Sequence, residues 1–393
     1  MKSQGKKKQW TWFIVERIKF LKHCFLFAKQ QQGKLNVLPF AMQFFQGKLK
    51  SVYRYNALML LSICFLTNVA AQDVVMSQFY SAPLYLNPAM SGIAYGPRFT
   101  VNYRNQWPGM GSGFNGGYTT YMGAFDMHID KIRSGIGLLV VADQMMNNIF
   151  GNYYVTLSFA PQIKFNRNVA MKIGASGTFI HRRLKWNELQ FSDMINPYSG
   201  FFDANGNPNA TGEPTPSRLS LNRGDLSAGF VIFTRKLYFG FAVNNFIMNK
   251  ENFSDAVEAR TPMRFTAHFG GSFPLKTKYS YKRNIYLSPN VLIANQGRNL
   301  QVNAGLLAGI EMIYFGAQFR YVINNPESFI MIVGVKKGKF RVGYSYDFPV
   351  SKLVNKTGGA HELTFTFNIA GDDNSLENKN NRGYLACPTI LNF

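Results

Sequence analysis

The chain has 393 residues, of which 46% are hydrophobic and only 16% are charged, with 35 glycines and an aromatic share of 15%. These figures exclude a disordered chain, favour a β-rich and turn-rich structure, and leave the charged share below the roughly one quarter that is usual in a soluble globular domain. About half of the net charge of +23 lies in residues 1–71, where Lys and Arg face one acidic residue, Glu16.

Residues 51–71 have the pattern of a signal peptide. A basic stretch ends at Arg54, an apolar run follows from Ala57 to about Leu66, and small residues stand at Val69 and Ala71. The run is shorter than the roughly 20 residues of a membrane-spanning helix, and its flanks suit signal peptidase. We predict cleavage after Ala71 and export. Residues 1–50 are then a leader or a misassigned start, with a basic nucleic-acid-binding arm as the rejected alternative.

Two further segments flank the region of predicted strands. Residues 72–96 contain SQFYSAPLYLNPAMSG, which is too long and too aromatic for a simple linker. Residues 371–393 are polar and then abruptly apolar, and they hold Cys387, the one cysteine after the predicted cleavage site. Because exposed ends of this composition would be sticky, we expect each segment to fold into the interior of the protein or onto a partner.

Apolar and polar residues alternate with a period of two through most of the remaining chain. In HELTFTFNI, for example, apolar residues from Leu363 to Ile369 alternate with Glu362, two threonines and an asparagine. Most such runs are longer than the 5–6 residues of an average soluble strand, and they match the roughly 9–11 residues of a tilted transmembrane strand. They predict fourteen strands, near 97–107, 117–130, 133–144, 150–166, 168–184, 223–234, 236–247, 262–275, 283–294, 298–309, 311–324, 327–336, 338–349 and 360–370.

The lengths of the connections form a second pattern. Alternate turns are short, as at 130–133, 166–168, 234–236 and 336–339, with 275–283 as a longer exception; the others are mostly longer, above all 185–222. Short turns at one rim and long loops at the other are typical of an outer-membrane barrel, and closure leaves no unpaired strand edge in hydrocarbon. We therefore predict an all-β transmembrane barrel of about 14 antiparallel strands over 97–370, with lipid against its apolar face.

The predicted barrel has three consequences. Fourteen strands enclose a lumen wider than wall side chains fill, so a segment of the chain plugs the lumen or the barrel conducts. An even strand count places both termini at the short-turn, periplasmic side. The basic residues of the short turns contact lipid headgroups or, in a sharper interpretation, an acidic periplasmic partner.

Weaker motifs do not indicate a chemical site. GSGFNG at 111–116 matches GxGxxG but precedes a predicted strand rather than a phosphate-binding helix. The segment 203–214 resembles a calcium loop, yet Pro208 and Pro214 stand where that loop needs Gly and a bidentate Glu; we expect a turn-rich loop. Histidines 128, 181, 268 and 361 lack metal-ligand spacing and are expected in the lumen or at a rim. We predict no catalytic, cofactor-binding or metal site, and no enzyme activity.

Two stretches resemble the PorP/SprF family. The NPAxxG pattern follows the predicted signal, the stretch GYSYDFPVSKLVNKTGGAHELTFTFNI is similar to the late signature of the family, and a terminal Cys-Pro pair is typical of it. The resemblance covers essentially all of 72–393. The residues that carry it, which are also candidate partner contacts, are Asn87, Pro88, Ala89, Gly92, Tyr346, Asp347, Gly358, Gly359, His361, Glu362, Leu363, Cys387 and Pro388.

The resemblance implies an outer-membrane component of the type IX secretion system of Bacteroidetes. Members are expected to help export, or to hold at the cell surface, large gliding adhesins with a type B C-terminal targeting domain. Implied partners are the translocon, the bilayer and a periplasmic peptidoglycan-binding lipoprotein, with no nucleic acid.

Two functions therefore compete. In the first, loops such as 185–222 bind the C-terminal domain of a secreted protein. In the second, the protein is a channel for small hydrophobic molecules, similar to the FadL barrels, which it matches in size.

Overall fold

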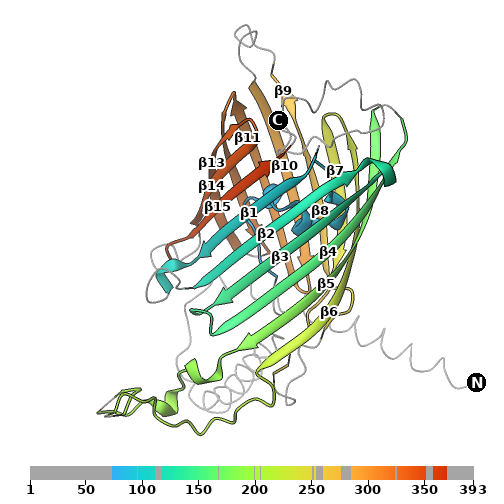
Figure 1. Ribbon diagram of the computed structural model, residues 1–393. Helices are drawn as coiled ribbons and strands as arrows, with labels where there is room; N and C mark the ends of the chain where they lie inside the picture. The colour runs from blue at the N-terminus through green and yellow to red at the C-terminus, as the bar shows by residue number, and fades with distance from the viewer. Residues whose placement is uncertain are drawn as a thin grey trace, which may run out of the picture. The chain divides into compact units, whose positions relative to one another are not determined.

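The computed structural model describes residues 73–94, 96–110, 117–166, 168–198, 200–203, 205–249, 252–253, 260–275, 285–323, 325–350 and 357–369. The leader, the predicted signal peptide, GSGFNG at 111–116, and the tail with Cys387 and Pro388 lie outside these residues. Most of the described chain forms one antiparallel sheet (Figure 1).

The strands follow one another in chain order around this sheet. They are β1 (Arg98–Gln106), β2 (Tyr118–Ile129), β3 (Ser134–Met145), β4 (Phe150–Lys164), β5 (Val169–Leu184), β6 (Ser220–Thr234), β7 (Leu237–Asn244), β8 (Arg264–Gly271), β9 (Phe273–Pro274), β10 (Ile285–Gln296), β11 (Asn299–Ile310), β12 (Ile313–Val322), β13 (Asn325–Lys337), β14 (Phe340–Pro349) and β15 (Ala360–Asn368).

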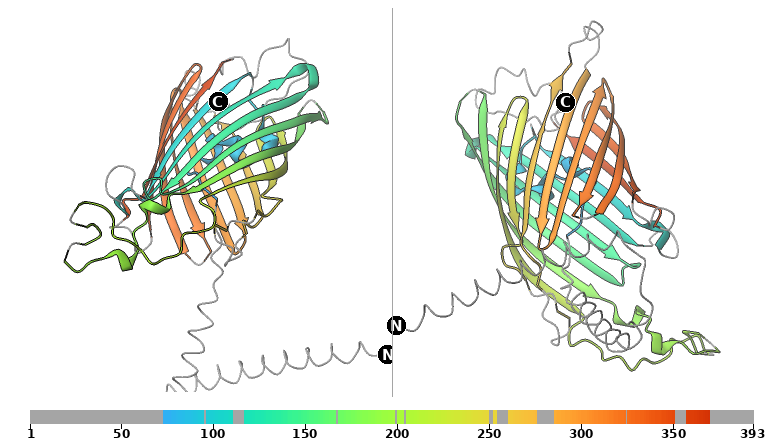
Figure 2. Two further views of the ribbon diagram at one scale, coloured as in Figure 1. Left: turned by 60° about the horizontal axis from the view of Figure 1, so that its bottom comes forward. Right: turned by 180° about the vertical axis from the view of Figure 1, so that it is seen from behind.

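The sheet closes into a barrel because β1 pairs with both β2 and β15. The predicted strand 262–275 is present as β8 and β9, which Ser272 separates and which both pair with β10. Counted as one interrupted strand, they give fourteen, so the predicted antiparallel barrel of fourteen strands is confirmed. Figure 2 shows the closed wall from two further directions.

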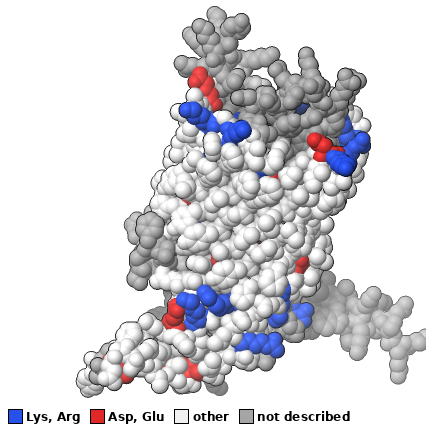
Figure 3. Space-filling model, viewed as in Figure 1, with Lys and Arg blue, Asp and Glu red and all other residues white. Residues whose placement is uncertain are grey.

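The two faces of the wall differ as the alternation predicted. On β15 the side chains of Leu363 and Phe365 are 47% and 40% exposed, whereas Glu362 and Thr364 are 0% and 2% exposed. Charged side chains gather near the two ends of the barrel and leave an almost uncharged band between them (Figure 3). This band is the surface that a transmembrane barrel presents to hydrocarbon.

The helical elements are short. The 3-10 helices η1 (Phe79–Ser81) and η2 (Pro88–Met90) flank α3 (Pro83–Leu86), and four more single turns lie in connections: η3 (Pro108–Met110), η4 (Asp130–Ile132), η5 (Trp186–Glu188) and η6 (Ser192–Met194). In the described part of the chain, no helix has the length and apolar character needed to cross a bilayer.

The connections separate by length in part, as predicted, with exceptions at both ends: 275–284 is long at the end with the short turns, and 146–149 is short at the other. The short turns between β2 and β3, and between β4 and β5, lie at the end opposite the loop 185–219, which extends below the barrel in Figure 1. The connections 297–298 and 323–324 are short although they belong to the end with this loop. We call the two ends the long-loop end and the short-turn end.

Candidate functional site

The lumen holds the chain segment that precedes β1. Residues 73–94, which we call the plug, include η1, α3 and η2 and lie inside the barrel in both views of Figure 2. Their apolar side chains pack against the lumenal faces of the wall in two clusters, and Ala89, Met90 and Ile93 are at most 1% exposed. A lumen too wide for wall side chains is therefore filled by the plug.

The plug runs the length of the barrel in the direction opposite to β1. Asp73 contacts the long-loop end, where its backbone N–H donates to Gln296 (3.0 Å) and its carboxylate accepts from Asn245 (2.9 Å). Gly92 lies near the short-turn end, where its N–H donates to Asp126 (2.9 Å). The first and last strands do begin and end at the short-turn end, as expected, but the described chain before β1 starts near the other end.

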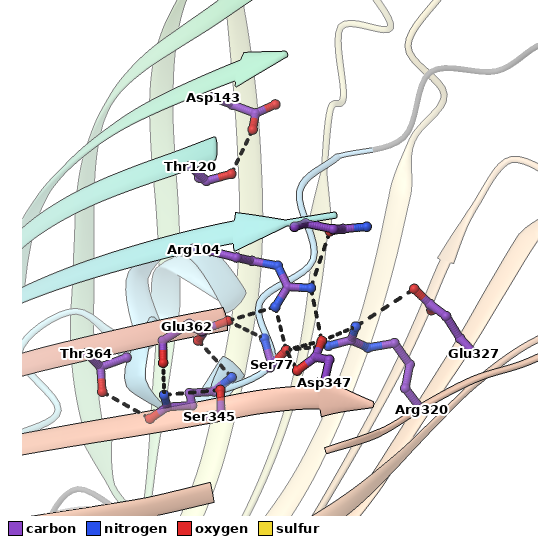
Figure 4. A network of polar contacts seen from close by, with 12 residues as sticks. Ser77, Arg104, Thr120, Asp143, Arg320, Glu327, Ser345, Asp347, Glu362 and Thr364 are labelled. Carbon is purple, nitrogen blue, oxygen red and sulfur yellow. Dashed lines mark hydrogen bonds and ion pairs between the residues drawn. The ribbon is translucent and has the colours of Figure 1, made fainter. Parts of the chain in front are cut away.

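The first anchor of the plug is an ionic network around Ser77 (Figure 4). The Ser77 hydroxyl donates to Asp347 (2.6 Å) and accepts from Arg104 (2.6 Å) and Arg320 (2.8 Å). Asp347 also accepts from Arg104 (3.0 Å) and from Arg320 (2.9 Å). These four side chains come from the plug, β1, β12 and β14, and all are buried.

Glu362 completes the network from β15. Its carboxylate accepts the backbone N–H groups of Ser77 (2.7 Å) and Gln78 (2.9 Å) and pairs with Arg104 at 3.2 Å. The buried part of the network thus holds two guanidinium and two carboxylate groups, whose formal charges balance, and the half-exposed Glu327 lies 3.8 Å from Arg320 at its edge. Balance and hydrogen bonds are what a buried ionic cluster requires, because unpaired charge is costly in a low-dielectric interior.

The second anchor is the NPA motif. The Asn87 side chain accepts from the N–H of Ala89 (2.9 Å) and so caps η2, while Pro88 occupies the first helical position; both choices are typical of helix starts. The Asn87 amide also donates to the carbonyls of Phe230 (3.1 Å) and Phe241 (3.2 Å) on the wall. One side chain therefore shapes the plug and attaches it to β6 and β7.

Glycines on the lumenal face let the plug approach the wall closely. A Cβ on Gly174 of β5 would collide with Ala89, and one on Gly229 of β6 would collide with Asn87. Gly92 of the plug has φ +58° and lies against the β2 backbone at Met127. Since a side chain fits none of these positions, the spacing of glycines around the lumen matches the path of the plug.

The third anchor lies near the short-turn end. Lys172 of β5 donates to the carbonyls of Ser91 (2.5 Å) and Gly92 (2.9 Å), and Arg98 pairs with Asp126 at 2.9 Å. Lys172, Arg98 and Asp126 are at most 2% exposed. The plug is thus attached near both ends and in the middle.

The structure separates the described family-motif residues into three groups. Asn87, Pro88, Ala89, Gly92, Asp347 and Glu362 are buried at contacts between the plug and the wall. Tyr346, His361 and Leu363 lie on the outer face, where the Tyr346 and His361 rings are 4.8 Å apart. Gly358 and Gly359, both with φ near +70°, form the turn into β15. A role of any of these residues as partner contacts stays a prediction.

The histidines lie where they were expected. His268 is buried in the lumen, 3.1 Å from the Asn87 amide, and His361 lies near the long-loop rim against the Tyr344 hydroxyl (2.8 Å). Within the described residues, no group of three or more His, Cys, Asp or Glu side chains could hold a metal ion.

A pocket lies between the plug and one side of the wall, toward the long-loop end. Its cavity volume is about 70 Å³, and it is partly open to solvent. Its lining combines polar and apolar surface and consists of Asp73, Leu84, Tyr85, Leu139, Val141, Tyr154, Thr156, Ser176, Thr178, Ile180, Asp225, Ser227, Asn244, Asn245 and Arg264.

The loop 185–219 outside the barrel has internal order. Its Asp193 carboxylate accepts from the Gly212 N–H (2.7 Å) and from the Thr211 hydroxyl (2.9 Å), and these bonds hold the pKa of Asp193 below its usual value. The Asp203 carboxylate accepts the N–H groups of Asn205 and Asn207 (2.8 Å each), as in a turn. The loop is therefore a hydrogen-bonded structure rather than an extended tether.

Sequence reasoning did not find Ser77, Arg104 or Arg320. The sequence did contain a signal for the two arginines. Arg104 and Arg320 stand in predicted strands, at positions that the alternation assigns to the lumenal face. Charged side chains at such positions need partners inside the barrel. Ser77 gave no signal, since nothing in its local sequence distinguishes it from a surface serine.

The family model described as "Type IX secretion system membrane protein PorP/SprF" matches residues 68–367. No curated protein matches the chain at a significant level. Among solved structures, the Ralstonia pickettii toluene transporter TbuX is 12% identical, with 77% of this chain and 95% of that chain covered and a TM-score of 0.43. A Pseudomonas aeruginosa FadL homologue is 13% identical, with coverages of 72% and 92% and a TM-score of 0.33.

Proposed function

The chain belongs to the PorP/SprF family of type IX secretion system membrane proteins, and we propose that it receives a large secreted protein at its long-loop end and holds it at the cell surface. In this proposal the cargo is of the gliding-adhesin type and carries a type B C-terminal domain. The type IX translocon of a Bacteroidetes cell delivers it, and the outer-membrane barrel is its anchor.

The observation that carries the proposal is the filled lumen. The plug is buried from Met76 to Ala94 and is fixed to the wall by three sets of polar contacts. A polypeptide does not pass through a barrel filled in this way, so contact with cargo takes place at the outer surface. A role in secretion then rests on binding rather than on conduction.

The loop 185–219 offers the most suitable surface for that binding. Tyr198 is 99% exposed, and Ile195 and Phe202 are 51% and 49% exposed, on a loop whose backbone is held by internal hydrogen bonds. Apolar side chains held in water mark interaction sites, and aromatic residues are enriched among those that contribute most to binding.

Deletion of residues 195–216 tests the proposal. The barrel should stay folded, because the strands β5 and β6 end outside the deleted range, while the amount of cargo at the cell surface falls at least tenfold. The double variant Tyr198→Ser, Phe202→Ser should reproduce much of this loss, and Glu213→Gln, a change at an exposed position of the same loop, should not. Unchanged cargo display in the deletion variant would contradict the proposal.

Transport of small hydrophobic molecules is the second candidate, and the pocket beside the plug is the observation that favours it. Against it stand the three anchors of the plug and the polar groups that line the pocket. Liposome swelling by the purified protein separates the two functions, because an anchor leaves the vesicles closed and a channel makes them swell.

A periplasmic partner is a further part of the proposal. Exposed basic residues mark the short-turn rim, among them Lys131, Arg133, Lys236 and Lys339. They suit lipid headgroups and also an acidic face of a peptidoglycan-binding lipoprotein. We propose no catalytic role, since the family is one of secretion-system membrane proteins rather than of enzymes.

A further inference from the structure

The pocket beside the plug has the features of a ligand site, and we propose that it binds a neutral saccharide from the cell exterior. This inference goes beyond the anchoring function and does not depend on it. The reasons lie in the opening of the pocket, in its free hydrogen-bonding groups and in the pairing of its charges.

The pocket lies near the long-loop end of the wall, where residues 245–249 continue beside β6 after the end of β7. β6 pairs with β7 only from Ala228 to Phe233, while residues 220–227 of β6 continue beyond the end of β7 at Asn244. Asn244 and Arg264, which line the pocket, are the residues where β7 ends and β8 begins, at the long-loop end. The pocket is partly open to solvent, and we take this opening as the entry for a solute at that end of the barrel.

Several polar groups that line the pocket, Ser176 and Ser227 buried and Tyr154 and Asn244 half-buried, have no hydrogen-bond partner among the described residues. Ser176 and Ser227 are each 8% exposed, and neither hydroxyl makes a hydrogen bond within the described residues. The same holds for the side chains of Tyr154 and Asn244. Since buried polar groups nearly always have a hydrogen-bond partner, these four side chains are available to water or to a ligand.

The charged groups of the lining, by contrast, are already engaged. Asp73 lies 3.9 Å from the Arg264 guanidinium and accepts from Asn245. Asp225 accepts the backbone N–H groups of Asn245 (3.0 Å) and Ile247 (3.1 Å). A charged ligand would therefore be desolvated without a free counter-ion, which disfavours fatty acids and acidic sugars.

The free groups are uncharged, and each can both donate and accept a hydrogen bond. A hydrocarbon would leave them unpaired at a cost in free energy, whereas sugar hydroxyls match them. The apolar side chains of Leu84, Leu139, Val141 and Ile180 suit the C–H face of a sugar ring. Leu84 and Tyr85 of the plug form part of the lining, and the small volume of about 70 Å³ suits a compact ligand rather than an extended peptide.

The test is saturation-transfer NMR on the full-length protein in an amine-oxide detergent, because a sugar-based detergent would compete. The probes are glucose, galactose, mannose and N-acetylglucosamine, with galacturonate and toluene for comparison. We expect saturation transfer to at least one neutral sugar and none to galacturonate. Transfer to toluene alone, or to none of the sugars, would overturn the inference.

Matched variants locate the site. Ser176→Ala and Ser227→Ala should each weaken sugar binding about two- to tenfold, the value of one hydrogen bond, and Asn244→Ala at the rim provides a third variant if either serine variant fails to fold. Ser328→Ala is the control, because Ser328 is also a buried hydroxyl without a partner but lies on β13 outside the pocket. Equal affinity in all four variants would place sugar binding elsewhere and refute the assignment, while cargo display, measured separately, reports on the anchoring function.

Discussion

Asp347 is the carboxylate on which both buried arginines converge, and its replacement by Asn tests whether the ionic network holds the plug. Asn has nearly the same shape, so the substitution removes charge without opening a cavity. Asp347 accepts from Arg104 (3.0 Å), Arg320 (2.9 Å) and Ser77 (2.6 Å). After Asp347→Asn the buried part of the network keeps two guanidinium groups and one carboxylate, Glu362, and carries a net charge of +1; the half-exposed Glu327, 3.8 Å from Arg320, remains nearby.

The expected magnitude follows from the burial of these groups. Arg104, Arg320 and Asp347 are at most 3% exposed, and removal of one partner from a buried ion pair typically costs about 3–5 kcal/mol. We therefore expect Asp347→Asn to lower the free energy of unfolding by about this amount. Because the plug is attached here to four strands, we expect a closed wild type in planar bilayers and a raised conductance for the variant.

Unfolding in guanidinium, followed by the mobility of the folded barrel in SDS gels, measures the first effect. The control Glu213→Gln removes a charge from an exposed loop position and should change stability by no more than about 0.5 kcal/mol. In the double variant Asp347→Asn, Arg320→Gln the charges balance again, so the loss should be smaller than the sum of the two single losses. Wild-type stability together with a closed pore in Asp347→Asn would refute the role of the network.

Two further predictions address the contact of the plug with the wall and the loop outside it. Gly174→Ala places a Cβ against the plug backbone and should lower the free energy of unfolding by about 1–3 kcal/mol, whereas Gly177→Ala, where a Cβ meets no atom within 4 Å, should not. The pKa of Asp193 is lowered in the folded loop, so its contribution to loop order is present above the usual Asp pKa of about 4 and is lost as pH falls through the lower, folded value. The amide NMR signal of Gly212 should follow that titration, and a signal that shifts at or above the usual pKa, or is unchanged by Asp193→Asn, would contradict it.

The wall could be predicted from the sequence because it depends on local alternation. Each apolar residue at an odd position of β15, such as Leu363 and Phe365, requires an apolar environment, and the period of two sends its neighbours to the other side. The number of strands then follows from the number of connections, and the lengths of the connections distinguish the two ends of the barrel. The interruption at Ser272 escaped this reasoning, since the residues on both sides of it keep an extended backbone.

The plug could not be predicted in the same way. Its residues touch the wall on all sides, so its apolar positions have no single periodicity, and its helices of three or four residues are shorter than any helical pattern that a sequence can reveal. The sequence of the wall strands instead contains the signal that a segment fills the lumen. Gly174 and Gly229 lie within strands at positions that face the plug, and Lys172 and Arg104 stand at lumenal positions, where each needs partners inside the barrel.

The ionic network also explains why motifs near both ends of the chain belong to one structure. Arg104 on β1 and Glu362 on β15 are direct partners across the seam where the first and last strands close the barrel. The same two side chains bind the plug at Ser77, more than 280 residues before Glu362. Contacts between such distant parts of a chain form at a high cost in loop-closure entropy. Because the plug supplies hydrogen bonds to both sides of the seam, its seating stabilises closure, and closure in turn encloses the plug.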